Sequence, residues 1–206
     1  MNGQKKKHIR FILEYTASFA VLFLLIYLGF ILNHHSFIWF YDGNKQHFPA
    51  LLYLRDYYLK VAGNLFSGHF TLPMFDFSIG MGEDILTTLN FYGLGDPLTL
   101  LSVFVPKQHM EMFYDFLVAF RMYLAGLTFI FYCRNRGKGR AVSLAGAWLY
   151  VFSGYVLHVA VKHPFFISPM ILLPLMLTGV DRYREKKRSG LLIGSVFLCA
   201  LNGFYF

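Results

Sequence analysis

The sequence has few cysteines and few charged residues for its length. Only two cysteines occur among 206 residues, Cys133 and Cys199, one at the end of an apolar run and one inside another. This number excludes a disulfide framework or a cysteine metal site, and we interpret both residues as inert and buried. The sequence also lacks a Walker loop, a GxSxG motif and an HExxH motif, and it shows no internal repeat or low-complexity segment.

What the sequence has instead is apolar residues. Hydrophobic residues make up 56% of the chain and aromatic residues 19%, against 15% charged. An ordinary soluble domain does not reach this balance. We therefore predict an all-α polytopic membrane protein, with residues 1–206 forming one membrane domain.

The basic residues are not spread along the chain. Of the 19 lysines and arginines, 13 fall in three clusters between apolar runs: Lys5, Lys6, Lys7 and Arg10; Arg134, Arg136, Lys138 and Arg140; and Arg182, Arg184, Lys186, Lys187 and Arg188. The net charge of +8 could suggest a nucleic-acid partner, but this placement is the positive-inside pattern of membrane proteins and argues against one. It predicts a multi-pass protein of the cell membrane with a cytoplasmic N-terminus.

The apolar runs predict five transmembrane helices, at residues 11–32, 111–133, 141–161, 165–180 and 190–206. The first run is too long for a signal-peptide core, and no small-residue cleavage site follows it. Pro169 and Pro174 should kink or open the fourth helix, which fits a cavity and plain packing equally well. Because the chain stops inside an apolar run, we expect a fragment of a longer protein.

Residues 33–110 form the first extracytoplasmic loop in this topology. They carry a net charge of −2, are too long for a simple connector, and are too apolar for a disordered segment. Residues 48–66 have the spacing of an amphipathic helix lying in the membrane interface. Asp96 and Pro97 resemble the N-cap and first residue of a second such helix. We therefore predict an ordered loop with juxtamembrane helices.

Asp42 is the first candidate catalytic residue. It lies just beyond the outer end of the first predicted span, after Trp39, Phe40 and Tyr41. A carboxylate in this partly desolvated zone suits a general base. The alternative is that Asp42 and Gly43 simply form a turn and that the aromatic residues are an interface belt. The histidines of this loop have no metal-ligand spacing, so we interpret His47 and the others as solvated or interfacial.

Three more acids, Glu83, Asp84 and Asp96, fall among glycines in the same loop. Converging with Asp42, two or three carboxylates could bind a divalent metal ion or orient a hydroxyl group. The alternative is that Asp84 and Asp96 are helix caps.

Three cationic residues are candidates for binding a phosphate from a lipid. Arg121 lies inside the second predicted span, where a charge is costly unless it reaches the interface or a polar cavity. Lys162 and His163 follow the third predicted span. Together they could bind a lipid phosphate. The alternative for Lys162 and His163 is capping of the helix C-terminus and contact with lipid headgroups.

Three blocks carry a resemblance to a known family. They are WFYDGNKQHFPALLYLRDYY, FDFSIGMGEDILTTLNFYGLGDPLTLL and VKHPFFISPMILLPLMLTGVDR, in this order and separated by membrane helices. They resemble the N-terminal part of the YfhO family of bacterial membrane proteins, over most of residues 37–190. Members look like GT-C-fold glycosyltransferases, which take a sugar from a polyprenyl phosphate such as undecaprenyl phosphate on the outer leaflet.

The resemblance implies a function and a set of roles. The implied acceptor is a cell-surface polymer, lipoteichoic or wall teichoic acid. Asp42 occupies the position of the essential acid after the first span, residues from Phe48 onward look like the first juxtamembrane helix, and Asp84 or Asp96 would be the second acid. The shared core of this fold has about seven spans, whereas we predict five here, so we expect the part of the donor site built by later helices to be absent. A transporter or flippase of a lipid-linked envelope precursor is the alternative, and a non-catalytic scaffold comes third.

Overall fold

The structure is a computed structural model, and it describes residues 3–69 and 71–203. Helices make up most of the described chain, and the strands within it form one two-stranded ribbon. The α-helices are α1 (Gly3–Ile26), α2 (Leu28–Leu32), α3 (Phe48–Phe66), α4 (Ile85–Asn90), α5 (Met110–Asn135), α6 (Arg140–Val151), α7 (Gly154–Lys162), α8 (Ser168–Lys186) and α9 (Gly190–Asn202). Shorter π- and 3-10 turns are η1 (Gly43–His47), η2 (Thr99–Phe104), η3 (Lys107–His109) and η4 (Pro164–Ile167). Strands β1 (Phe75–Asp76) and β2 (Glu83–Asp84) pair antiparallel, with Phe75 opposite Asp84.

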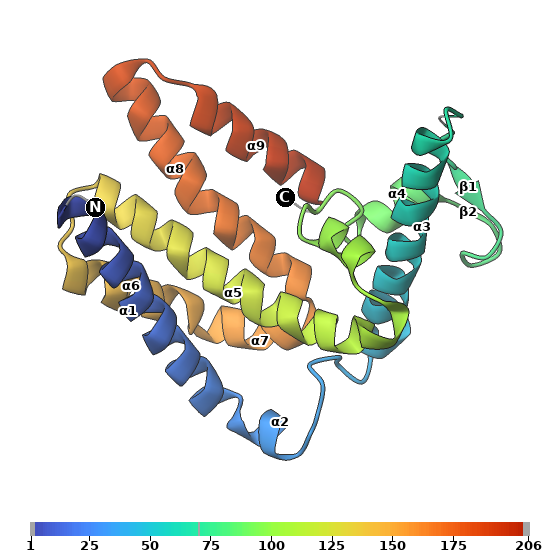
Figure 1. Cartoon of the computed structure of the whole chain (residues 1–206), viewed down its shortest axis with the longest axis horizontal. Coiled ribbons are helices and arrows are strands. Elements are labelled where there is room, and N and C mark those ends of the chain that lie inside the picture. The colour runs from blue at the N-terminus through green and yellow to red at the C-terminus, as the bar shows by residue number, and fades with distance from the viewer. Residues whose placement is uncertain (1–2, 70, 204–206) are drawn as a thin grey trace.

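The turns that carry the basic clusters and the first loop lie at opposite ends of the molecule. In Figure 1 the start of α1, the α5–α6 turn and the α8–α9 turn lie together at the left, and all three carry basic clusters. We call this the basic end. Helices α3 and α4 and the β1–β2 ribbon lie at the right, which we call the loop end. The predicted separation of basic clusters from the first loop is thus seen in the fold.

Three helical segments are long and apolar enough to cross a membrane: Lys6–Ile26, Lys107–Asn135 and Pro164–Lys186. The pair Arg140–Val151 and Gly154–Lys162 passes the same criterion as one bent span. The chain is therefore an all-α polytopic membrane protein. Helix α9 is apolar but has only 13 residues. The last residues of the predicted fifth span, 204–206, lie outside the described residues.

Two details of the predicted spans are corrected by the structure. The third predicted helix, 141–161, is not continuous, because α6 and α7 meet at an angle of 50°. The break lies at Ser153, whose backbone is extended and whose hydroxyl accepts a hydrogen bond from the Val156 amide at 3.5 Å, so that α7 starts with its own N-cap. The fourth helix ends at Lys186 rather than near 180 and is one helix through Pro174.

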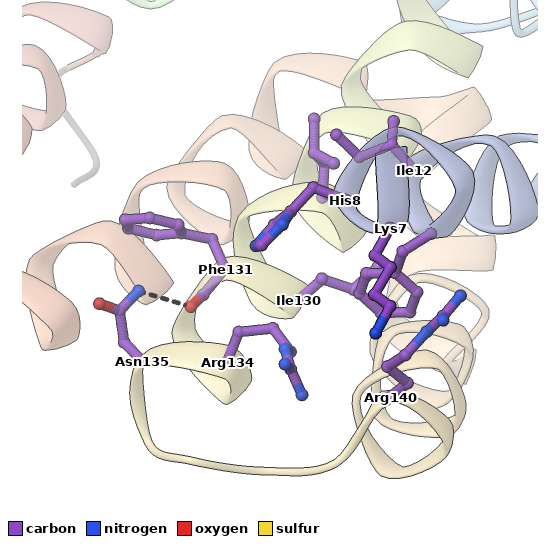
Figure 2. A pocket seen from close by; sticks show the side chains of 10 residues that line it. Lys7, His8, Ile12, Ile130, Phe131, Arg134, Asn135 and Arg140 are labelled. Atoms are coloured by element: carbon purple, nitrogen blue, oxygen red, sulfur yellow. Dashed lines mark hydrogen bonds between the residues drawn. The ribbon is translucent and has the colours of Figure 1, made fainter. Parts of the chain in front are cut away.

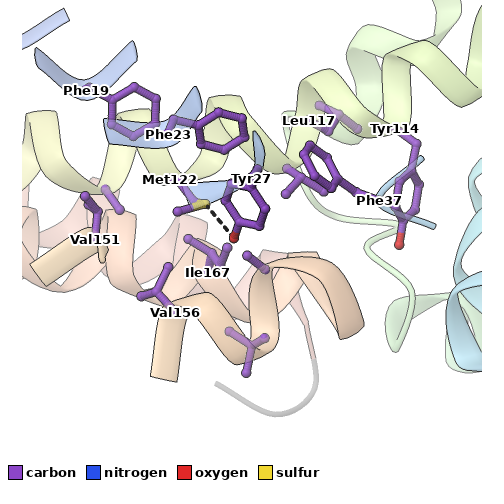
Figure 3. Close-up of a cluster of buried hydrophobic side chains, with 14 of the residues drawn as sticks. Phe19, Phe23, Tyr27, Phe37, Tyr114, Leu117, Met122, Val151, Val156 and Ile167 are labelled. Carbon is purple, nitrogen blue, oxygen red and sulfur yellow. Dashed lines mark hydrogen bonds between the residues drawn. The ribbon is translucent and has the colours of Figure 1, made fainter. Parts of the chain in front are cut away.

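Aromatic side chains fix α1 against α5. Every fourth residue along one face of α1 is a buried aromatic residue, Phe11, Tyr15, Phe19 and Phe23, and Tyr27 continues the spacing just after the helix. Residues four apart lie above one another on a helix, so this spacing forms one continuous stripe. The Tyr15 hydroxyl donates to the Tyr123 carbonyl at 2.9 Å, and the Tyr27 hydroxyl donates to the Met122 sulfur at 3.8 Å (Figure 3).

The predicted juxtamembrane helix is present as α3. It buries Ala50, Leu51, Leu54 and Tyr57 in a small second core together with Ile85 and Leu89. The predicted helix with Asp96 as its N-cap is wrong in detail. A 3-10 helix, η2, starts at Thr99 with Leu98 as its N-cap, because the Asp96 carboxylate instead accepts from the Leu98 amide at 2.9 Å and faces the interior.

Helix α9 returns from the basic end to the loop. It packs so closely on α8 that a Cβ atom at Gly179 would lie 2.7 Å from the Leu192 backbone. At its far end, a Cβ atom at Gly95 would overlap the Leu201 carbonyl. Two glycines therefore permit α9 to connect the helical bundle to the first loop.

Candidate functional site at the loop end

The segment that carries Asp42 is anchored to α5. The Asp115 carboxylate accepts hydrogen bonds from the Ser36 hydroxyl at 2.8 Å and from the Phe37 amide at 2.7 Å. Asp42 then begins the π-turn η1, and its own carboxylate accepts from the Gln46 amide group at 3.1 Å. The carboxylate is thus held at the start of η1, partly exposed to the surroundings.

A pair of histidines joins this segment to the end of α7. His47 Nε2 and His163 Nδ1 are 2.9 Å apart, in a hydrogen bond between residues 116 positions apart in the sequence. His47 is only 7% exposed, and Phe165 packs edge-on against its ring. The interpretation of His47 as solvated or interfacial is therefore wrong, because its ring is enclosed by η4 and by its histidine partner.

Burial determines the charge of this pair. Burial and, to a smaller extent, the neighbouring His163 lower the pKa of His47 to about 4, although the Asp42 carboxylate and the Lys162 carbonyl partly oppose the shift. Burial also lowers the pKa of His163, again with Asp42 opposing it. Both imidazoles are consequently neutral at pH 7, and Asp42 lies close enough to influence both.

Lys162 approaches the same place from α7. Its ammonium group lies 4.8 Å from the centre of the Trp39 ring, and Trp39 also contacts the His163 ring edge-on. Trp39 is thus part of this contact rather than only of an interface belt, whereas Phe40 and Tyr41 are exposed. The structure brings together three of the predicted site residues, Asp42, Lys162 and His163.

A groove of about 350 Å³ opens beside the histidine pair. It is lined by Gln46, His47, Thr87, Thr88, Phe91, Tyr92, His163, Phe165 and Phe166. The Tyr92 hydroxyl donates to Gln46 at 2.8 Å, and Gln46 in turn holds Asp42. The groove therefore combines hydroxyl groups, two imidazoles and aromatic faces, which is a surface that can bind a polar ring-shaped ligand.

Behind His47 lies a much smaller cavity, of about 30 Å³. Three of the side chains that line it have a buried polar atom with no hydrogen-bond partner among the described residues. These atoms are His47 Nδ1, the Tyr114 hydroxyl and Arg121 Nε. Buried polar atoms are normally paired, so these three are exceptions within a cavity that is otherwise lined largely by apolar side chains.

Arg121 is buried in the fold rather than exposed beside Lys162 and His163. Its guanidinium forms an ion pair with Asp96, and the side chains of the two residues are 4% and 1% exposed. The Ser168 hydroxyl donates to the same carboxylate at 3.5 Å. The charge of Arg121 is thus neutralised within the fold. Its grouping with Lys162 and His163 around a phosphate stays a prediction.

Glu83 and Asp84 lie in β2, at the start of α4. The Asp84 carboxylate is the N-cap of α4 and accepts from the Thr87 amide at 2.6 Å, a bond that holds its pKa below the usual range. The helix-cap alternative for Asp84 is therefore confirmed. Glu83 accepts from the Thr88 hydroxyl at 3.4 Å. Within residues 3–69 and 71–203, no group of three His, Cys, Asp or Glu side chains could hold a metal ion.

The burial of His47 could have been predicted from the sequence. His47 precedes Leu51 by four residues and Leu54 by seven, which places it on the buried face of α3 extended by one turn. Gln46 and Tyr92 carried no such signal, because their contact joins two parts of the loop.

Comparison with known proteins gives one match. The family described as "Bacterial membrane protein YfhO" matches residues 15–206. No curated protein and no solved structure matches the chain. The match covers nearly the whole chain, including the Asp42 segment, the groove and the helices that support it, so this chain belongs to the YfhO family of bacterial membrane proteins.

Proposed function

We propose that this chain is part of a membrane glycosyltransferase. The enzyme would take a sugar from a polyprenyl-phosphate carrier and transfer it to a cell-surface polymer, lipoteichoic or wall teichoic acid, on the outer face of the membrane. The observation that supports this proposal most is the meeting of Asp42, Lys162 and His163 beside a groove at the loop end. By the positive-inside rule this end faces outward.

Asp42 would be the general base in an inverting transfer. It accepts the proton of an acceptor hydroxyl while the hydroxyl oxygen forms a bond to the anomeric carbon. The bond between that carbon and the carrier phosphate breaks, and its electron pair leaves on the phosphate oxygen. Gln46 holds the carboxylate in position through the 3.1 Å hydrogen bond.

Lys162 would stabilise the leaving phosphate by its charge. His47 and His163 are neutral at pH 7, so they would contribute hydrogen bonds rather than charge. The hydroxyls of Thr87, Thr88 and Tyr92 in the groove would bind sugar hydroxyls. We assign no step to Arg121, because Asp96 already neutralises it.

The test is the Asp42→Asn variant in the full-length protein, produced in cells that lack the native copy. We expect the variant to reach the membrane in normal amounts while polymer glycosylation falls by at least about a hundredfold, the range that general base catalysis supplies. Glu111→Gln, which removes an exposed carboxylate at the start of α5, is the matched control and should retain glycosylation. Normal glycosylation in Asp42→Asn would remove Asp42 from the mechanism.

A transporter or flippase of a lipid-linked precursor is the second candidate. It is favoured by the broken α6–α7 span and by the buried pair Arg121–Asp96, since broken helices and buried charges occur in transporters. Measuring carrier-linked sugar after gene deletion separates the two. Accumulation on the outer leaflet indicates a lost transferase, and accumulation on the inner leaflet indicates a lost flippase.

A further inference from the structure

A second and larger groove lies at the basic end, far from the Asp42 segment. It has a volume of about 640 Å³ and lies between the start of α1, the last turns of α5 and the first residue of α6 (Figure 2). Its lining residues are Lys7, His8, Phe11, Ile12, Leu127, Ile130, Phe131, Arg134, Asn135 and Arg140. The proposed transferase uses none of them.

The groove combines apolar walls with a cationic rim. Phe11, Ile12, Leu127, Ile130 and Phe131 form the walls. In Figure 2 the nitrogen-bearing ends of Lys7 and Arg134 lie on the side of the groove toward the α5–α6 turn. The groove thus separates an apolar part from a positively charged part.

Two of these cations are not neutralised by an acid. Arg140 forms an ion pair with Glu14 at 2.6 Å and is the cation of the rim that is neutralised. Arg134 donates instead to the Lys138 carbonyl at 2.5 Å, which leaves its charge uncompensated. Over the described part of the chain, neither Lys7 nor Arg134 forms a salt bridge. A ligand that fits this charge must be anionic at one end.

We propose that this groove binds an anionic glycerophospholipid of the leaflet at the basic end. The phosphate would lie between Lys7 and Arg134, and an acyl chain would follow the walls past Ile12 and Ile130. A free phosphate would leave the apolar walls exposed, and an apolar helix of another protein would leave two charges unpaired. Basic pockets between transmembrane helices bind anionic headgroups for this electrostatic reason.

The experiment is native mass spectrometry of the full chain, titrated with phosphatidylglycerol or phosphatidylcholine of identical acyl chains. We expect at least one phosphatidylglycerol to bind about tenfold more tightly than phosphatidylcholine, because each Lys or Arg near a headgroup favours an anionic lipid. The double variant Lys7→Gln with Arg134→Gln should lose this preference.

The matched control is Arg184→Gln with Arg188→Gln. Arg184 and Arg188 are exposed residues of the basic end that do not line the groove. Replacing both removes the same amount of charge as the first double variant. This control should keep the preference for phosphatidylglycerol. Thermal unfolding of all three proteins in one detergent identifies a loss of folding. Equal binding of both lipids by the unmodified chain, or equal loss in both double variants, would overturn the proposal.

Discussion

The two histidines at the loop end illustrate how much a single residue's surroundings decide its role. His47 and His163 are enclosed by aromatic side chains and bonded to each other, so their ordinary tendency to ionise near neutral pH is suppressed. They behave as neutral hydrogen-bonding groups that hold the Asp42 segment to α7. Any acid condition that charges them should weaken that connection.

The first prediction concerns pH. The pKa of His47 is lowered from 6.5 to about 4 in the folded state, so the unfolded chain binds more protons between these values. Stability is therefore full above pH 6.5 and falls as the pH drops toward 4, by up to about 3 kcal/mol for this group. The temperature of unfolding in detergent, followed from pH 7.5 to 4.5, should show this fall.

The control for this prediction is a second histidine of the same loop. His47→Gln should show a clearly smaller decrease in unfolding temperature across the window, while His109→Gln, which removes an exposed ring, should follow the unmodified chain. Parallel curves for His47→Gln and the unmodified chain would show that His47 titrates normally.

The candidate site could be predicted only in part at this scale. Asp42 and the Lys162–His163 pair were recognisable from their places next to apolar runs and from the resemblance to a family. Arg121 pairs with Asp96, and His47 pairs with His163. Both contacts join residues far apart in the chain, so they cannot be predicted from local spacing. These contacts decide which cation is available to a ligand.

Among the elements, the α8–α9 hairpin depends on one small residue. Gly179 faces the backbone of Leu192, where even one added carbon would lie 2.7 Å from main-chain atoms. Close approach of this kind is common between membrane helices with small residues at their interface. Because main-chain atoms cannot turn aside like the end of a side chain, the helices themselves would have to separate.

The second prediction compares two identical substitutions. Gly179→Ala should destabilise the chain by about 1–3 kcal/mol, the usual cost of overpacking. Gly194→Ala on α9 has open space around it and should be neutral or slightly stabilising, since alanine favours a helix over glycine. Thermal unfolding of both variants measures the difference. A Gly179→Ala variant as stable as Gly194→Ala would contradict the close packing.

The elements themselves were partly predictable. Long apolar runs identified the positions of α1, α5 and α8, and amphipathic spacing identified α3. The break at Ser153 was not predicted, because residues 141–161 are apolar on both sides of it and the capping hydroxyl of one serine determines where α7 starts. The apolar composition of a segment indicates whether it is long enough to cross a membrane, but it does not indicate whether the segment forms one straight helix.

At the scale of the whole molecule, the separation of the basic end from the loop end determines the proposed activity and the lipid site together. Three basic clusters gather at one end (Figure 1), and the groove beside the histidine pair lies at the loop end, among residues of η1, α4 and η4. If the basic end faces the cytoplasm, the groove faces the outer leaflet, where lipid-linked sugars are used in this proposal.

The third prediction tests this orientation. In a background with Cys133→Ser and Cys199→Ser, single cysteines are introduced as Ser67→Cys at the loop end and Lys138→Cys at the basic end, both at exposed positions. A maleimide that cannot cross membranes should label Ser67→Cys in intact cells and Lys138→Cys only after permeabilisation. The reverse pattern would place the groove in the cytoplasm and remove the proposed transferase.

The hydrogen bond between His47 and His163 also bears on biosynthesis. The first loop leaves the ribosome well before residue 163, because the two histidines are 116 positions apart. Contacts of such long sequence separation are slow to form, because a long loop must close first. During translation the groove beside the histidine pair cannot be complete until the residues up to Phe166 have been made, because Phe165 and Phe166 line it.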